Sequence, residues 1–327
     1  MKKALIVGID YYEHIESLFG CVNDSNSVTS VLARNGDKEK GKNFDINHKV
    51  ASSASNLITR GDLKDSITKL FEDSSEIALF YFAGHGYIEN GGGYLVTSEC
   101  YRGDDGLSLD DVLNIANSSK AKNKIIVLDS CHSGIVGNTS YSGNKALLSE
   151  GVTILTASSA TQYAKEENGQ GVFTSLFVDA LNGSASNLVG DISPASIYAH
   201  IDQSLGSWDQ RPIFKTNIIK FVSLRKVQAP ISLEDLLKIT KLFEEANSKI
   251  LLDPSFEPKR DNTDLKDLPV PIKENVEKFG ILQKYNRINL VVPIGEEHMY
   301  YVAMNSKSCE LTSLGKHYWN LVKKDRI

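Results

Sequence analysis

Two side chains suited to act as nucleophile and base follow apolar runs of the sequence. His85 comes shortly after Ile77–Phe82 and has a glycine on each side, and Cys131 comes shortly after Lys124–Leu128. An imidazole beside a thiol favours the thiolate, and the protonated ring can return the proton to a leaving amine. The backbone N–H groups of Gly86 and Cys131 are candidate donors to the oxyanion of such an attack. The pattern predicts nucleophilic acyl transfer by a His–Cys dyad.

These side chains need a sheet to bring them together. Continuous apolar runs such as Ile77–Phe82 and Lys124–Leu128 are typical of strands buried on both faces. Short apolar runs alternate with helical patterns over the first two thirds of the chain, which predicts a mostly parallel sheet with helices on both faces. Further strands are predicted at Ala4–Val7, Lys49–Ala51, Tyr94–Val96 and Val152–Thr156, and helices at Asn23–Arg34, Leu57–Phe71, Asp110–Ala116, Phe173–Leu181 and Pro194–Leu205. If the two runs are neighbouring strands, His85 and Cys131 meet at one edge of this sheet.

Composition sets limits on the function. The chain has 327 residues, 41% of them hydrophobic and 24% charged, with a net charge of -5, which gives no general attraction to nucleic acid or anionic lipid. The first apolar run is short and is followed by Asp10 and Glu13, which favours a buried strand over a signal peptide. The four cysteines have irregular spacing that fits neither a zinc site nor a disulfide framework. We therefore expect a cytoplasmic protein with no membrane segment and no nucleic-acid partner.

The residues around the dyad carry a resemblance to a known family. Tyr81-Phe82-Ala83-Gly84-His85-Gly86 and Asp129-Ser130-Cys131-His132-Ser133-Gly134 resemble the catalytic signature of the caspase and metacaspase family, peptidase C14 of clan CD. The resemblance covers about residues 1–224 and keeps the order and spacing of the family. It implies a caspase–hemoglobinase fold and a cysteine endopeptidase that forms a thioester acyl-enzyme. Further matches are Gly20-Cys21-Val22-Asn23-Asp24, Thr156-Ala157-Ser158-Ser159, Gln162, Ala164, Glu166, Gly171 and Phe173.

The resemblance also implies a substrate preference. In metacaspase-like members, acidic residues matching Asp24 and Asp129 line the S1 pocket, which holds the substrate residue before the cut. Two carboxylates there select Arg or Lys. Ala83 departs from the Ser of many metacaspases, so one hydroxyl is missing from this pocket. Other roles remain open, because Asp24 can cap the helix that follows it and Asp129 can order nearby backbone amides.

Calcium activation is known among metacaspases, and the resemblance places Glu99, Asp110 and Asp111 near the matching positions. Their oxygen ligands suit calcium, although Asp110 is also a natural helix N-cap and Asn138 stands where the family has an acidic residue. We expect no required cofactor, with these three residues as a candidate calcium site. Lys145 is the basic residue between Cys131 and the strand predicted at Val152–Thr156. It is therefore a candidate site of self-cleavage.

The C-terminal third differs from this family. We predict a peptidase domain at 1–227, a helix and linker at 228–272, and a small α+β, winged-helix-like domain at 273–327. The expected elements beyond 228 are a helix at 233–252, a linker at 253–273, a helix at 274–286, a hairpin at 289–305 and a helix at 311–324. Basic and acidic residues there number about fifteen each, so we expect binding of an activator protein rather than DNA.

Three classes of function remain open at this point. The first is a regulated endopeptidase that cleaves protein substrates, and the family implies a role in bacterial antiviral defence or cell death, for example by activating gasdermins. The second is a catalytically silent caspase-like scaffold or protein-interaction module. A DNA-binding regulator would need salt-dependent binding to duplex DNA.

Overall fold

The computed structural model describes residues 1–89, 92–130, 147–157, 166–167, 170–206, 211–259 and 268–327. The chain divides into two compact units, Met1–Gln228 and Ala229–Ile327, each with its own core. Cys131, Asn138 and Lys145 lie outside the described residues. Among the helices that the described ranges contain, none is both long enough and apolar enough to cross a membrane.

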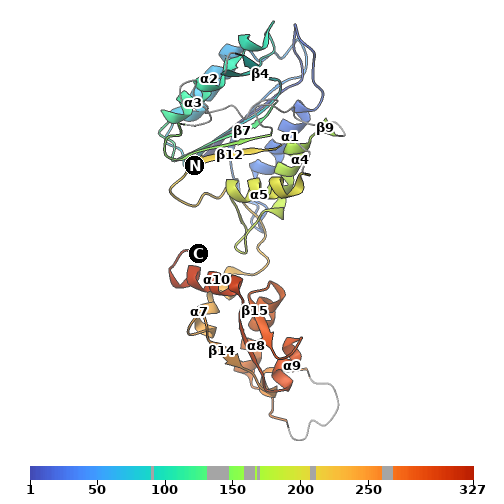
Figure 1. Ribbon diagram of the computed structural model, residues 1–327, viewed down its shortest axis with the longest axis vertical. Helices are drawn as coiled ribbons and strands as arrows, with labels where there is room; N and C mark the ends of the chain where they lie inside the picture. Colours follow the sequence, from blue (N-terminus) through green and yellow to red (C-terminus); the bar gives the residue numbers. More distant parts are fainter. Residues whose placement is uncertain (90–91, 131–146, 158–165, 168–169, 207–210, 260–267) are drawn as a thin grey trace. The chain divides into compact units, whose positions relative to one another are not determined.

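A six-stranded sheet forms the centre of the first unit (Figure 1). Its strand order is β12-β8-β7-β3-β1-β2. Neighbours are parallel except β12, which runs antiparallel to β8 at one edge. The predicted mostly parallel sheet is therefore confirmed, and the antiparallel edge strand is an addition to it. The strands are β1 (Lys2–Ile9), β2 (Asp45–Ala51), β3 (Ile77–Ala83), β7 (Asn123–Asp129), β8 (Val152–Thr156) and β12 (Ile213–Asn217).

Helices cover both faces of the sheet (Figure 1). Because side chains alternate along a strand, Phe80 and Phe82 of β3 pack in the core under α2 and α3, whereas Leu79 and Tyr81 pack in the core under α1, α4 and α5. Both faces of β3 are thus buried, which explains its continuous apolar sequence. The helices are α1 (Cys21–Ala33), α2 (Arg60–Glu72), α3 (Leu109–Asn117), α4 (Val172–Asp179), which continues into a π-helical turn at Ala180–Ser184, and α5 (Pro194–Ser204).

Side-chain caps fix where the helices begin. Thr59 and Asp62 form a capping box at α2, and the Ser108 hydroxyl accepts from two N–H groups at the start of α3. The start of α1 is capped from another segment, because Asp10 Oδ1 accepts from the backbone N–H groups of Cys21 (2.8 Å) and Val22 (3.3 Å). The loop that follows β1 is thereby tied to α1.

Smaller elements surround the main sheet. β4 (Gly86–Glu89), β5 (Gly92–Leu95) and β6 (Leu107–Ser108) form a separate antiparallel sheet, so the strand predicted at Tyr94–Val96 does not join the main one. Short pairs also form between β9 (Glu166–Glu167) and β10 (Gln170–Gly171), and between β11 (Asp191–Ile192) and β13 (Arg225–Lys226).

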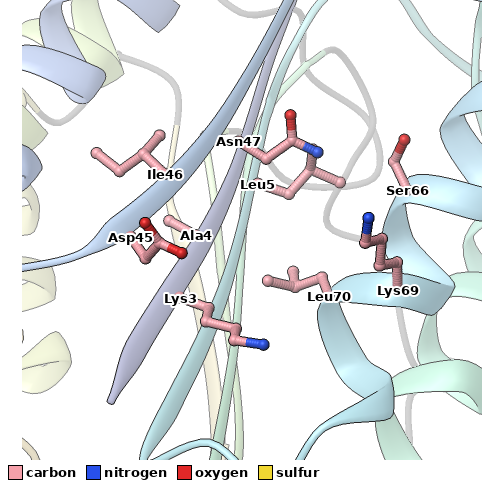
Figure 2. Close-up of a pocket in the computed structure, with 9 residues that line it drawn as sticks. All are labelled: Lys3, Ala4, Leu5, Asp45, Ile46, Asn47, Ser66, Lys69 and Leu70. Atoms are coloured by element: carbon pink, nitrogen blue, oxygen red, sulfur yellow. The ribbon is translucent and has the colours of Figure 1, made fainter.

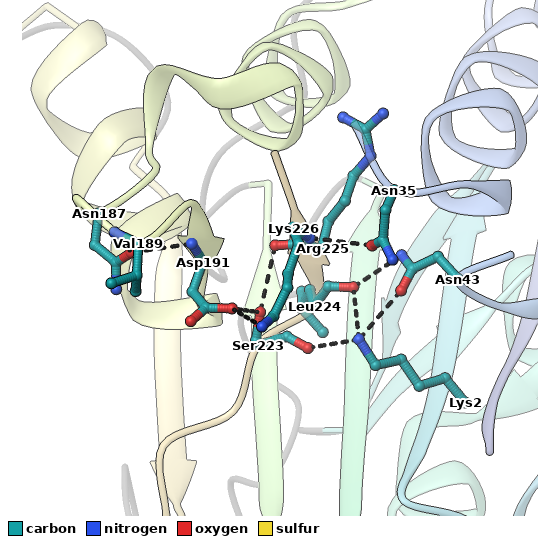
Figure 3. Close-up of polar contacts among 10 residues, drawn as sticks. All are labelled: Lys2, Asn35, Asn43, Asn187, Val189, Asp191, Ser223, Leu224, Arg225 and Lys226. Carbon is teal, nitrogen blue, oxygen red and sulfur yellow. Dashed lines mark hydrogen bonds and ion pairs between the residues drawn. The ribbon is translucent and has the colours of Figure 1, made fainter. Parts of the chain in front are cut away.

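A half-buried lysine joins the end of the first unit to its beginning. Lys2 Nζ donates to the carbonyls of Ser223 (2.9 Å) and Leu224 (3.3 Å) and to Asn43 Oδ1 (3.1 Å), as Figure 3 shows. Burial lowers the pKa of this lysine, and these acceptors offset part of the cost of desolvating it. The segment after β12 is thus tied to the first strand.

The second unit contains a three-stranded antiparallel sheet in the order β14-β16-β15. The helices predicted at 274–286 and 311–324 are confirmed as α8 and α10. The single helix predicted at 233–252 is wrong, because this stretch forms two short helices and β14. The hairpin predicted at 289–305 is also wrong, because α9 lies between β15 and its partner β16. The elements are α6 (Leu233–Leu237), α7 (Ile239–Leu242), β14 (Lys249–Leu251), a 3-10 turn (Pro254–Phe256), α8 (Lys273–Arg287), β15 (Val291–Ile294), α9 (Met299–Met304), β16 (Ser308–Leu311) and α10 (Ser313–Lys323).

The segment 228–272 therefore does not act as a separate helix and linker. Its strand β14 pairs with β16, with Ile250 opposite Cys309, so residues on both sides of the predicted boundary at 273 share one sheet. The unit is α+β in class. Its winged-helix assignment stays a prediction.

Candidate active site

The strands that precede the two predicted catalytic residues are neighbours. β3 and β7 are parallel, and their last residues, Ala83 and Asp129, are paired in register. The Gly84 N–H donates to the Asp129 carbonyl (3.4 Å), so the two chains stay together just past the strands. His85 and Cys131 each follow this paired end by two residues. The two apolar runs are therefore neighbouring strands, as a His85–Cys131 dyad requires. Cys131 itself lies outside the described residues.

The His85 ring is held from the loop after β1. Its Nε2 lies 2.8 Å from the Glu16 carbonyl oxygen, its ring centroid lies 4.8 Å from that of Tyr12, and its backbone N–H donates to the Tyr12 hydroxyl (2.8 Å). Because a carbonyl oxygen only accepts, Nε2 carries the proton and Nδ1 presents its lone pair. The contact with Glu16 thus selects the tautomer in which Nδ1 is the basic nitrogen.

Gly84 allows this close packing. A Cβ at position 84 would lie 2.8 Å from the Tyr12 hydroxyl and 2.9 Å from the Phe82 ring, closer than real contacts allow. Burial raises the pKa of Tyr12 well above its usual range, so its hydroxyl stays neutral beside His85. Gly84 is therefore needed for steric reasons, because a larger residue would clash with Tyr12 and Phe82.

Gly86 begins β4, and the direction of its N–H follows from the pairing with β5. Hydrogen-bonded and non-hydrogen-bonded residue pairs alternate in an antiparallel ladder. The Val96 N–H donates to the His85 carbonyl (3.0 Å), so the next pair, Gly86 with Leu95, is of the non-hydrogen-bonded kind. The Gly86 N–H therefore points away from β5, as a donor to an oxyanion must.

Asp24 and Asp129 come together although 105 positions separate them in the sequence. Both are buried, with 3% and 7% of their surface exposed. A Cβ at Gly171 would lie 2.6 Å from Asp129 Oδ2 and 3.0 Å from Asp24 Oδ2, so both carboxylates reach the same glycine. The Gly171 N–H donates to Asp24 Oδ2 (3.0 Å) and Oδ1 (3.2 Å), and Thr174 Oγ1 donates to Asp129 Oδ2 (2.6 Å). Asp24 is the fourth residue of α1, so its carboxylate lies beyond the N-cap position.

The three residues of the candidate calcium site have other contacts. Glu99 Oε1 accepts from the Arg60 N–H (2.6 Å) at the start of α2, and Asp111 forms an ion pair with Lys64 (3.4 Å). Asp110 lies exposed in the first turn of α3, two residues past the N-cap, which is Ser108. No group of three His, Cys, Asp or Glu side chains within the described ranges is arranged to hold a metal ion. Glu99, Asp110 and Asp111 alone therefore do not fit calcium.

A cavity of about 170 Å³ lies elsewhere in the first unit, between β1, β2 and α2 (Figure 2). None of the predicted site residues lines it. Its charged lining residues are Lys3, Asp45 and Lys69, and Lys3 forms an ion pair with Asp73. This cavity is separate from the residues gathered at the ends of β3 and β7.

The sequence did not point to the groups that orient His85. The Glu16 contact uses a backbone carbonyl, which every residue has, so no side-chain pattern could reveal it. Tyr12 is an aromatic residue in a loop, and only the fold brings its hydroxyl beneath His85. Thr174 stands next to Phe173, which belongs to the family resemblance, but nothing in the sequence assigns its hydroxyl to Asp129.

The fold is the caspase-like α/β fold, with a mostly parallel sheet and helices on both faces. A family model described as the caspase domain, Peptidase_C14, matches residues 1–230. The chain belongs to this family, and family membership supports a cysteine peptidase.

Two known proteins show how far the similarity extends. Metacaspase-1 of Candida albicans (strain SC5314 / ATCC MYA-2876) is 27% identical over 158 residues, which cover 43% of this chain and 35% of that relative. The matched region is thus about a third of the length of that relative. The crystal structure of protein GSU0716 from Geobacter sulfurreducens is similar with a TM-score of 0.51 and 17% identity, covering 70% of this chain and 98% of that one. At this identity the likeness concerns the fold alone.

Proposed function

We propose that the chain is a cysteine endopeptidase that cleaves proteins after Arg or Lys, with His85 and Cys131 as its catalytic dyad. The observation that carries this proposal is the pairing of Ala83 with Asp129 at the ends of β3 and β7. His85 and Cys131 each come two residues after this pair. The Glu16 carbonyl adds support, because it leaves Nδ1 of His85 as the base.

The proposed reaction has two stages. Nδ1 of His85 takes the proton of the Cys131 thiol, and the sulfur attacks the carbonyl carbon of the scissile bond. The carbonyl electrons move to oxygen, which accepts hydrogen bonds from the N–H groups of Gly86 and Cys131. The C–N bond then breaks, the proton on Nδ1 passes to the leaving amine, and a thioester remains. Water next gives a proton to Nδ1 and attacks the thioester carbon. The C–S bond then breaks, the acid is released, and the proton on Nδ1 returns to the sulfur of Cys131.

Asp24 and Asp129 supply the proposed preference for a basic side chain. Two buried carboxylates that reach one glycine form a concentrated negative site. A guanidinium or ammonium group would offset their repulsion and gain charge-assisted hydrogen bonds. An acidic substrate side chain would meet two like charges and be rejected. The same pair argues against cleavage after Asp.

Other parts of the proposal are broader. The second unit, Ala229–Ile327, is proposed as a regulatory module that binds an activator protein, and its balanced charge favours a protein partner over nucleic acid. Location in the cytoplasm and a role in bacterial defence or cell death, for example by cleaving a gasdermin, are part of the same proposal. Calcium activation and self-cleavage after Lys145 stay predictions.

The test is hydrolysis of fluorogenic peptides that end in Arg, Lys or Asp, with calcium and with a chelator. Wild type should cleave the Arg and Lys peptides, and Cys131→Ala should lose roughly 10⁴-fold in kcat/KM or more. Cys309→Ala, at a buried cysteine of the second unit, is the matched control and should keep wild-type activity. Equal rates for wild type and Cys131→Ala would favour the silent scaffold, and cleavage after Asp would refute the assignment of Asp24 and Asp129.

A further inference from the structure

A chain of hydrogen bonds leads from the core of the first unit to Asp129. Tyr81 lies in the middle of β3 and is fully buried, and its hydroxyl bonds to Thr174 Oγ1 on α4. Thr174, which is 1% exposed, bonds in turn to Asp129 Oδ2 (2.6 Å). The three groups come from three elements, β3, α4 and β7, which the fold places on one face of the sheet.

The direction of this chain is set by its last member. A carboxylate only accepts, so the single hydroxyl proton of Thr174 is donated to Asp129. The oxygen of Thr174 is then the acceptor for the Tyr81 hydroxyl. Burial and the charges of Asp129 and Asp24 raise the pKa of Tyr81 well above its usual range, which keeps this tyrosine a neutral donor. Hydrogen bonds in a buried chain of this kind strengthen one another.

The same turn of α4 also holds the second carboxylate. Gly171 is the N-cap of α4, and its N–H donates to both oxygens of Asp24. Thr174 is the third residue of the helix, so Asp24 and Asp129 both lie at its N-terminal end, where the helix dipole favours negative charge. One rigid turn thus fixes the position of each carboxylate relative to the other.

We propose that Thr174 and Tyr81 are positioning residues that orient the Asp129 carboxylate for recognition of an arginine guanidinium. The inference rests on the proposed function, because it assumes that Asp24 and Asp129 bind the substrate's basic side chain. The bond from Thr174 fixes the rotation of the Asp129 carboxylate about its Cβ–Cγ bond. A planar guanidinium needs this orientation for parallel hydrogen bonds, whereas a lysine ammonium interacts as a point charge and needs it far less.

The inference therefore predicts a change in the ratio of Arg to Lys cleavage. Thr174→Val keeps the shape of the side chain and removes the hydroxyl, so kcat/KM for Arg peptides should fall about 10-fold through KM, and that for Lys peptides about 2-fold. Tyr81→Phe should shift the ratio in the same direction by a smaller amount. Thr174→Ser, which restores a hydroxyl, should recover most of the preference for Arg.

Two controls separate positioning from a loss of structure. Thr153 is buried to the same degree, and its hydroxyl pairs with Thr216 (2.9 Å) in the sheet, so Thr153→Val should leave the Arg/Lys ratio unchanged. The rate at which iodoacetamide alkylates Cys131 should be the same in wild type and Thr174→Val, because this reaction needs no S1 pocket.

The outcomes are distinguishable. An active wild type whose Thr174→Val variant keeps the Arg/Lys ratio, or loses both activities equally, overturns the positioning role alone. A wild type that cleaves neither Arg nor Lys peptides overturns the proposed function and this inference with it. A selective loss of Arg cleavage, with recovery in Thr174→Ser, supports the inference.

Discussion

Two groups of acidic residues in the first unit were assigned functions from the same family resemblance, and the structure treats them differently. Asp24 and Asp129 are buried and reach one glycine, where a backbone N–H and a threonine hydroxyl hold them. The candidate calcium residues Glu99, Asp110 and Asp111 do not form a group that could hold a metal ion. Asp24 and Asp129 thus converge on one turn of α4, whereas the three candidate calcium residues have separate contacts.

The two groups of acidic residues differ in the kind of donor that contacts their carboxylates. The donors named above for Asp24 and Asp129 are neutral groups, so these hydrogen bonds bring no counter-charge, in keeping with the proposed binding of a cation. Lys64 instead supplies Asp111 with a counter-charge, and the first turn of α2 occupies one oxygen of Glu99. These contacts hold Glu99 and Asp111 separately rather than together, although an exposed ion pair contributes only about 0–1 kcal/mol.

Among changes to these acidic residues and their neighbours, the largest effect is expected when the charge of Asp129 is removed. Asp129→Asn keeps the size of the side chain but breaks its pairing with the substrate's basic group, so kcat/KM for Arg peptides should fall by about 10²- to 10³-fold. Peptide hydrolysis measures this loss, and alkylation of Cys131 by iodoacetamide checks that the nucleophile remains reactive. A loss below 3-fold, with a wild-type thermal midpoint, would remove Asp129 from the S1 pocket.

A smaller but still large effect is expected from adding one methyl group between the carboxylates. In Gly171→Ala the new Cβ would overlap Asp129 Oδ2, so both carboxylates must shift and kcat/KM for Arg and Lys peptides should fall by roughly 10- to 100-fold. Gly41→Ala is the matched control, because a Cβ at Gly41 meets nothing within 4 Å. Unchanged kinetics in Gly171→Ala would mean that the carboxylates do not act from these positions.

The comparison also shows what the sequence can predict. The apolar runs at Ile77–Phe82 and Lys124–Leu128 indicated buried strands, because a strand covered on both faces is apolar throughout and these runs are too short for most helices. The sequence left open whether these two strands are neighbours, and the structure pairs them as β3 and β7. By contrast, β14 has only three residues, of which the middle one is half-buried and the outer two are exposed. So short a segment cannot show a periodicity that separates a strand from a helix. Its pairing with β16 is a tertiary effect.

The candidate site divides in the same way. Asp24 and Asp129 were found through the motifs around them, but their convergence on Gly171 depends on how α1, β7 and α4 pack. The Glu16 carbonyl and the Thr174 hydroxyl were not predicted, because each acts through a contact between segments far apart in the sequence. Residue type identifies groups that can react, whereas their orientation comes from the packed fold.

The smallest effect is expected at the acidic residues of α3. The double change Asp110→Asn and Asp111→Asn removes two exposed or half-exposed charges, one of them paired with Lys64 at the surface. Because such pairs contribute about 0–1 kcal/mol, activity toward Arg peptides should stay within roughly 2-fold of wild type. Adding calcium or chelator should change the rates of wild type and the double variant by the same factor. If calcium activates wild type but not the double variant, the prediction is wrong. Asp110 and Asp111 would then bind the ion despite their separate contacts.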